Sequence, residues 1–424
     1  MLRLAGSLVM TRLLVPEMFG VMAVAATVTA ITSMMSDVGI RQAVIQSANG
    51  DSREMLDTAW LLQILRGFVI WGIAGVVAAM LAAAQNMRWI ADGSVYASPE
   101  LPAVVAAVAL NAVITGFQST KAMTAHRHLQ LRRLTVIELI GQLVTVVAMI
   151  LLGWATRSIW SLVLGGLIGS FVMMALSHLW LRGIPNRFGW DSTAFREIYQ
   201  YGRWVVLSSS LAVFAIHGDR LLLGIWVDAA TLGFYVLALN LMMMVEDGTG
   251  RLFQSVAMPA LSETRRNNPE KLREVYSRIR LPFDLALLGG SGILAAIGPS
   301  LVGLLYDPRY AMAGDILAVI AIGLVFSRFG LGISVLLALG ETKKLVTINI
   351  VRLAMLFIGV PLGYSLFGLW GAIWAIALHR APLLPTIWIL LKPHRLHSVR
   401  YEMLILGTWP VAYGSGYITV SLLS

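Results

Sequence analysis

Residues 134–181 decide the fold of this protein, and they read LTVIELIGQLVTVVAMILLGWATRSIWSLVLGGLIGSFVMMALSHLWL. Among Asp, Glu, Lys and Arg, only Glu138 and Arg157 interrupt this apolar stretch. One membrane span needs about 20 mostly apolar residues, so the stretch is long enough for two. We therefore predict two spans, 134–156 and 158–181, joined by a very short connection.

The rest of the chain repeats this pattern. Hydrophobic residues make up 58% of the sequence and charged residues 13%, about half the usual share of roughly 25%. A water-soluble chain of 424 residues could not bury so much apolar surface in one or two cores. We predict an all-α polytopic membrane protein with an incomplete first helix at about 1–14. The full spans are expected near 17–37, 57–84, 101–120, 134–156, 158–181, 200–223, 230–255, 281–306, 311–339, 344–366, 368–391 and 402–423.

Basic residues are unevenly divided between alternate loops. One set of loops carries 21 Lys and Arg residues and the other set carries five. By the positive-inside rule the basic set lies in the cytoplasm. The segment 1–14 is then the remainder of a truncated first helix that starts on the cytoplasmic side. The formal net charge of +10 belongs to these loops and forms no long basic tract, so nucleic acid is not an expected partner.

A weak internal repeat divides the chain into two halves. Thr11-Arg-Leu-Leu before Phe19-Gly20 resembles Asp219-Arg-Leu-Leu before Leu232-Gly233, and Ser158-Ile-Trp resembles Gly368-Leu-Trp. The shared offset predicts two six-span lobes, 1–195 and 196–424. Because six is even, the two lobes are parallel repeats, which is typical of transporters that bind substrate between their halves.

Several motifs resemble the polysaccharide flippases of the multidrug/oligosaccharidyl-lipid/polysaccharide exporter superfamily, in particular the Wzx-like and exopolysaccharide exporter branch. The motifs are Arg12-Leu-Leu-Val-Pro16-Glu17-Met-Phe-Gly20, Asp37-Val-Gly39-Ile40 with Ala43-Val-Ile-Gln46, Asp219-Arg-Leu-Leu-Leu-Gly224, Leu232-Gly233-Phe-Tyr235, Pro259-Ala-Leu-Ser262 and Gly340-Glu-Thr-Lys343. Their order and spacing along nearly the whole chain carry the resemblance, since each motif alone is loose.

The resemblance implies a non-enzymatic transporter of the bacterial cytoplasmic membrane that needs no cofactor. Its implied cargo is an undecaprenyl-pyrophosphate-linked oligosaccharide, moved from the cytoplasmic to the periplasmic leaflet by alternating access. Its implied partners are this lipid-linked substrate, the lipid bilayer, and the polymerase and co-polymerase of polysaccharide assembly.

Arginines inside predicted spans are the candidate substrate ligands. An Arg at a helix centre costs roughly 2.5–3.5 kcal/mol on insertion scales, so it usually faces protein or water. Its guanidinium pairs bidentately with phosphate oxygens, which suits a pyrophosphate head group. The alternatives are snorkelling to the interface and an internal ion pair with a carboxylate. The candidates are Arg66, Arg328, Arg352 and Arg380.

Carboxylates inside spans are candidates for ion coupling or gating. Glu138 has no obvious local partner and is the best lone candidate. Asp219 lies beside Arg220 and is expected to be a structural tie first and a gate second. Asp247 and Arg251 are four residues apart, so an ordinary helical ion pair is the simpler interpretation of Asp247.

Two other classes of function stay open on the sequence. A cation-coupled drug or metabolite exporter of the same superfamily would more often place acids and aromatics in its cavity, whereas Arg predominates here. A membrane-embedded polymerase or glycosyltransferase would usually carry a sizeable outward loop with catalytic residues, and the longest such loop, about 85–100, holds few. The sequence lacks cysteine and lacks a P-loop, so thiolate metal sites and P-loop nucleotide hydrolysis are excluded.

Overall fold

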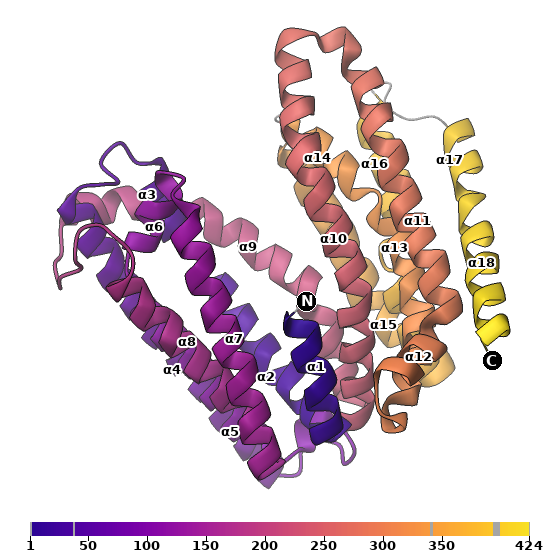
Figure 1. The fold of residues 1–424 in the computed structure, drawn as a ribbon, viewed down its shortest axis with the longest axis horizontal. Coiled ribbons are helices and arrows are strands. Elements are labelled where there is room, and N and C mark those ends of the chain that lie inside the picture. Colours follow the sequence, from indigo (N-terminus) through magenta and orange to yellow (C-terminus); the bar gives the residue numbers. More distant parts are fainter. Residues whose placement is uncertain (1, 37–38, 340–341, 393–398, 424) are drawn as a thin grey trace. The chain divides into compact units, whose positions relative to one another are not determined.

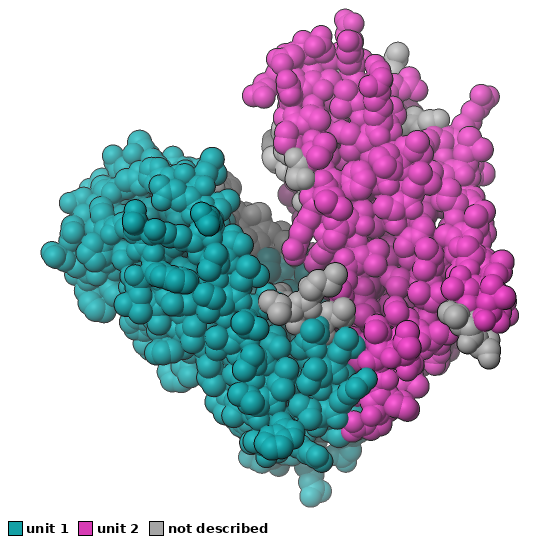
Figure 2. Space-filling view, viewed as in Figure 1, with its two compact units in different colours: residues 1–233 teal, residues 234–424 magenta. Residues whose placement is uncertain are grey.

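A computed structural model describes residues 2–36, 39–339, 342–392 and 399–423. Within these ranges every regular element is a helix, and the chain forms two compact units, residues 1–233 and 234–424. Figure 2 shows the two units in teal and magenta.

Unit 1 contains nine helices of the described chain and the start of a tenth, and Figure 1 labels them. They are α1 (Leu2–Leu13), α2 (Pro16–Met35), α3 (Ile40–Gln46), α4 (Arg53–Asn86), α5 (Leu101–Gly116), α6 (Lys121–Arg127), α7 (Leu131–Thr156), α8 (Trp160–Leu179) and α9 (Ser192–Trp226). A short 3-10 helix, Val95–Ala97, lies between α4 and α5. Helix α7 packs along α8, α4 packs along α5, and α5 contacts both α2 and α8.

Unit 2 combines the long helices α10 (Ala229–Asn267), α11 (Leu272–Leu305) and α15 (Thr342–Leu378) with shorter helices. The shorter helices are α12 (Ala311–Ile320), α13 (Leu324–Ser327), α14 (Gly330–Ala338), α16 (Leu383–Leu391), α17 (Val399–Leu406) and α18 (Thr408–Leu423). Short 3-10 helices cover Pro269–Lys271, Pro308–Tyr310 and Ala321–Gly323. Helix α11 is central, because α12 and α18 both pack against it.

Each predicted span overlaps one or more helices of the described chain, and residue 37 of the span 17–37 lies outside the described residues. Eight segments of the described chain are long and apolar enough to cross a membrane, or nine if the bent pair α5 and α6 forms one span. One of them, Lys344–Leu391, has 48 residues, which is far more than a single span requires. Gly368 interrupts it with a φ of 62°, and a Cβ built on Gly363 would lie 2.4 Å from the carbonyl oxygen of Gly371. The chain therefore reverses at Gly368, where the sequence predicts the division between spans 344–366 and 368–391.

Helix α9 belongs to unit 1, whereas the sequence division at residue 195 assigns it to the second lobe. It packs against α2, α3 and α4. At its C-terminal end it also holds the α4–α5 connection: the Tyr96 hydroxyl donates to the Leu221 carbonyl at 3.0 Å, and the Val95 amide donates to the Val227 carbonyl at 3.0 Å. The compact unit follows these contacts, while the boundary between the sequence repeats stays a prediction.

The repeat-related glycines meet in unit 1. A Cβ built on Gly20 would lie 1.9 Å from the carbonyl oxygen of Ala229, and a Cβ built on Gly233 would lie 2.2 Å from that of Pro16. Each glycine thus lies against a carbonyl group of the other helix, and that carbonyl group belongs to the residue four positions before the other glycine. Only residues without a Cβ permit this approach between α2 and the first turn of α10. The two matched motifs of the repeat are therefore a reciprocal helix contact.

Candidate functional site

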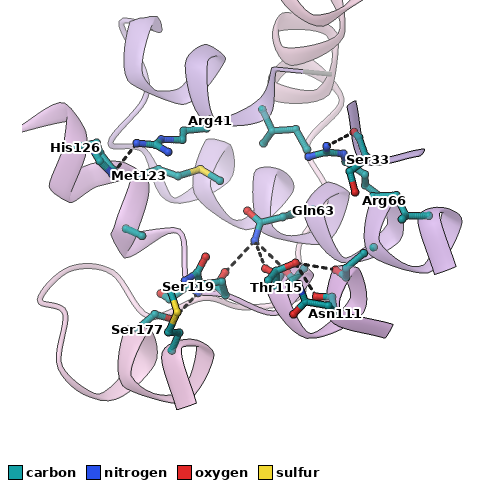
Figure 3. A pocket seen from close by; sticks show the side chains of 18 of the residues that line it. Ser33, Arg41, Gln63, Arg66, Asn111, Thr115, Ser119, Met123, His126 and Ser177 are labelled. Atoms are coloured by element: carbon teal, nitrogen blue, oxygen red, sulfur yellow. Dashed lines mark hydrogen bonds between the residues drawn. The ribbon is translucent and has the colours of Figure 1, made fainter. Parts of the chain in front are cut away.

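Unit 1 encloses a polar cavity of about 510 Å³ between apolar helices. Its lining comes from α2, α3, α4, α5, α6, α7 and α8, and Figure 3 shows it from close by. The polar and charged lining residues are Thr29, Ser33, Arg41, Gln42, Gln63, Arg66, Asn111, Thr115, Gln118, Ser119, His126, Glu138 and Ser177. Such a lining is costly in a membrane protein unless it meets water or a polar ligand.

Arg66 lies inside α4 and lines this cavity, as its position within a span predicts. Its Nη2 donates to the Ser33 carbonyl at 2.7 Å (Figure 3). Its Nε donates to the Ser36 hydroxyl at 3.3 Å. Ser33 lies in the last turn of α2, where carbonyl groups lack intrahelical partners. The negative end of the α2 dipole therefore positions the guanidinium group.

Arg41 is a second cation of the cavity, and the sequence interpretation missed it. It lies in the short helix α3, and its Nη2 is 2.7 Å from His126 Nε2 of α6. The side chain is exposed toward the cavity that it lines. Arg41 follows the predicted span 17–37, so the sequence pattern places it in a loop. Because Arg41 and Arg66 are 25 residues apart in the chain, the sequence does not indicate that they line one cavity.

Side-chain amides complete the site where α5 ends and α6 begins. These two helices meet at 66°, so the carbonyl groups at the break lose their helical partners. Gln63 Nε2 donates to the carbonyls of Thr115, Gly116 and Gln118 at 3.0, 3.1 and 3.3 Å. Asn111 Oδ1 is buried and, within the described part of the chain, accepts no hydrogen bond. Asn111 also lines the cavity, so its side-chain amide adds to the polar groups gathered at this break.

Polar pairs at helical spacing were the signal for this cavity. Thr29 with Ser33, Gln63 with Arg66, and Asn111 with Thr115 each lie three or four residues apart. Residues at this spacing lie on one face of a helix, so each pair marks the inner face of an otherwise apolar span.

Glu138 also lines the cavity and is exposed to it. It is the one carboxylate among the described lining residues. The structure thus brings Glu138 and Arg66 into one cavity, although they lie on different helices and were predicted for different roles.

Arg328 is placed differently from the expectation. Its side chain is 1% exposed, and it pairs with Asp284 at 3.3 Å and with Glu402 at 2.6 Å. Arg280 pairs with the same two carboxylates, and the Tyr401 hydroxyl donates to Asp284 Oδ2 at 3.1 Å. Two cations and two anions thus form a buried neutral cluster, because unpaired charges at this depth would be unstable. This geometry matches the alternative of an internal ion pair with carboxylates, and Arg328 is not among the residues that line the polar cavity of unit 1.

Arg380 also has a carboxylate partner. Its Nη1 donates to Glu246 Oε1 and to the Ser327 hydroxyl, each at 2.6 Å. Glu246 and Ser327 line a second cavity, of about 250 Å³, together with Asp247 and Arg251. Asp247 is exposed and, within the described chain, forms no ion pair with Arg251. The sequence suggested an ion pair for Asp247, but the ion pair that the structure shows here joins its neighbour Glu246 to Arg380, which lies 134 residues away in the turn between α15 and α16.

Arg352 and Asp219 complete the set of predicted residues. Arg352 Nε lies 3.4 Å from His379 Nε2, and both side chains are half-buried in unit 2. Asp219 is 8% exposed in α9, next to Arg220, whose Nη1 is 2.8 Å from His217 Nδ1. The structure places Arg66, Glu138 and Asp219 in unit 1, and Arg328, Arg352, Arg380 and Asp247 in unit 2.

Comparisons with known proteins agree with this architecture. A family model described as polysaccharide biosynthesis protein matches residues 9–306. None of the curated proteins matches the chain.

Among solved structures, an inward-facing multidrug resistance transporter of the MATE family and MOP superfamily has a TM-score of 0.69 at 13% identity, covering 100% of this chain and 94% of that one. The lipid II flippase MurJ in an inward closed conformation has a TM-score of 0.68 at 11% identity, covering 100% and 98%. A MOP superfamily transporter from Pyrococcus furiosus, described as having a binding pocket of reverse polarity, has a TM-score of 0.52 at 16% identity, covering 99% and 89%. The predicted class, an all-α polytopic membrane protein, is confirmed.

Proposed function

Because this chain belongs to the polysaccharide biosynthesis protein family, we propose that it moves a lipid-linked oligosaccharide across the bacterial cytoplasmic membrane by alternating access. The proposed cargo is a saccharide on undecaprenyl pyrophosphate, transferred from the cytoplasmic leaflet to the outer leaflet. Polysaccharide polymerase and co-polymerase proteins stay predicted partners.

The polar cavity of unit 1 carries this proposal. Arg66 and Arg41 supply guanidinium groups, which pair with phosphate oxygens in bidentate fashion. Gln63, Gln42 and Asn111 supply amide donors and acceptors, which match the hydroxyl groups of sugars. A pyrophosphate-linked saccharide needs both kinds of group in one place, while its lipid tail stays in the bilayer.

The cavity also bears on the choice between two activities. One similar structure is described as a lipid II flippase and another as a multidrug resistance transporter, and both share only the fold with this chain. Two arginines and one glutamate among the charged lining residues favour an anionic head group over a cationic drug. In this scheme Glu138 is the proposed site for a coupling ion, since it is the carboxylate among the described residues that line the same cavity.

A complemented deletion strain tests the proposal through Arg66. We expect Arg66→Ala to raise lipid-linked saccharide in the membrane and to lower surface polysaccharide by roughly 10–100-fold, because a hydrogen bond to a charged group contributes about 1.5–3 kcal/mol. Arg66→Lys keeps the charge but loses the planar fork, so we expect partial activity.

The matched control is Arg88→Ala, which removes an exposed Arg that lies outside the cavity. It should complement fully, with membrane levels of all variants checked by immunoblot. If the deletion strain makes normal amounts of surface polysaccharide and is more sensitive to toxic cations, the flippase proposal is wrong and the protein is a drug exporter.

A further inference from the structure

A further cavity, lined by three arginines, lies at one end of unit 1, and the proposed transport does not use it. Its volume is about 270 Å³, and it lies where α7 begins and α8 ends. Its lining consists of Ala125, Gln130, Arg132, Arg133, Leu181 and Arg182. Three cations and no carboxylate thus share one small cavity.

These cations are poorly compensated, unlike other basic residues nearby. Arg127 pairs with Asp51 at 3.0 Å, and its Nη1 donates to three carbonyls at the end of α3. In contrast, Arg132 and Arg182 form no hydrogen bond or ion pair with any residue that the structure describes. Arg133 has one long contact, at 3.5 Å, to the Trp180 carbonyl. Like charges in one cavity repel each other, so an anion would stabilise all three.

A hydrogen-bonded turn precedes α7 beside the cavity. Leu129 has a φ of 55°, which is uncommon for a residue with a branched side chain. The turn is held by the Gln130 amide, which donates to the Ala125 carbonyl at 2.8 Å. Helix α7 then begins at Leu131 without a side-chain cap, so its first amide groups and the positive end of its dipole face the same region.

The predicted spans place this cavity at the depth of lipid head groups. The predicted spans 134–156 and 158–181 begin and end at its rim, on the side that the positive-inside rule assigns to the cytoplasm. Leu129 and Leu179 beside it are each 80% exposed, and Trp180 is 50% exposed. An exposed tryptophan at a span end is typical of the membrane interface. A phosphate bound here would therefore carry acyl chains.

We propose that this cavity binds the phosphate of an anionic membrane lipid, held by Arg132, Arg133 and Arg182. Basic pockets between transmembrane helices on the cytoplasmic side are suited to such head groups. The buried cluster of Leu134, Ile137 and Leu181 lies between this site and the polar cavity, since Leu134 and Ile137 line the polar cavity and Leu181 lines this one. A lipid bound here would therefore lie against the same apolar cluster that borders the polar cavity.

Native mass spectrometry of the purified full chain tests the assignment. The probes are dioleoyl phosphatidylglycerol, dioleoyl phosphatidylcholine and inorganic pyrophosphate. Each Arg near the membrane surface contributes roughly a fivefold factor, so we expect the variant Arg132→Gln, Arg133→Gln, Arg182→Gln to bind phosphatidylglycerol about 100-fold more weakly. Arg182 lies beyond the end of α8, so Arg182→Gln alone should not affect folding. We expect this variant to bind phosphatidylglycerol about fivefold more weakly.

The control variant carries Arg187→Gln, Arg266→Gln and Arg273→Gln, which change the net charge equally at exposed positions outside the cavity. It should bind phosphatidylglycerol as the wild type does. Equal losses in both triple variants would reduce the effect to general surface charge and overturn the site. Pyrophosphate binding that displaces the lipid at equal concentration would overturn the lipid assignment in favour of a free anion. This test measures lipid binding and does not depend on transport by the Arg66 variants. The proposed lipid site and the proposed transport function can therefore fail independently of each other.

Discussion

At the scale of single residues, the arginines within spans separate into two kinds. Arg66 lines a polar cavity, and main-chain and hydroxyl oxygens position it. Arg328 and Arg380 are matched by carboxylates on other helices. The same residue type in the same apolar context is thus a ligand candidate in one place and a structural ion-pair partner in another.

The buried cluster around Arg328 predicts a large stability effect. Glu402→Gln leaves Arg328 and Arg280 with less negative charge in a buried site, and breaking such a pair costs about 3–5 kcal/mol. We expect the free energy of unfolding in detergent to fall by this amount. Glu274→Gln is the control, because its pair with Arg278 is exposed and contributes about 1 kcal/mol or less. Similar values for both variants would show that the cluster is not an essential tie between α11 and α17.

Tyr96 predicts a change of stability with alkaline pH. Burial raises the pKa of its phenol to about 12 from the ordinary value of 10.0. The folded state therefore favours the neutral phenol, and this contribution is complete below pH 10 and is lost as the pH rises toward 12. We expect the melting temperature of the wild type to fall more steeply over this range than that of Tyr96→Phe. At neutral pH the variant should lose about 1 kcal/mol with its hydrogen bond to Leu221. Parallel pH curves would contradict the assignment.

At the scale of helices, glycines decide where the chain bends and where it packs. Gly368 allows α15 to reverse, and Gly20 and Gly233 allow α2 and α10 to touch. The first position was predictable as the division between two spans. The second was visible only as a weak repeat, whose spatial meaning needed the folded chain.

Gly20→Ala should therefore be destabilising. Its Cβ would lie 1.9 Å from the Ala229 carbonyl oxygen, so the helices must separate, at a cost of about 1–3 kcal/mol. Gly72→Ala is the matched control, because nothing lies within 4 Å of its Cβ and alanine favours a helix by up to about 1 kcal/mol. Thermal unfolding in detergent compares the two variants. A Gly20→Ala protein as stable as Gly72→Ala would contradict the close contact.

At the scale of the whole molecule, the sidedness of the loops is a separate prediction. The basic loop that contains Arg187 should face the cytoplasm, and the loop that contains Asp92 should face outward. The chain has no cysteine, so Arg187→Cys and Asp92→Cys each provide a single label site. A membrane-impermeant maleimide applied to intact spheroplasts should modify only Asp92→Cys. Labelling of both positions from the same side would overturn the predicted topology.

The amino-acid sequence by itself determined the membrane class and the family, because hydropathy and the order of motifs can be read directly along the chain. Tertiary structure alone decided which charged groups are neutralised and which line a cavity. Glu402 lies 74 residues from Arg328, and Glu246 lies 134 residues from Arg380. Burial in the bilayer requires each charge to find a partner or water, and the packing of distant helices determines which of the two it finds.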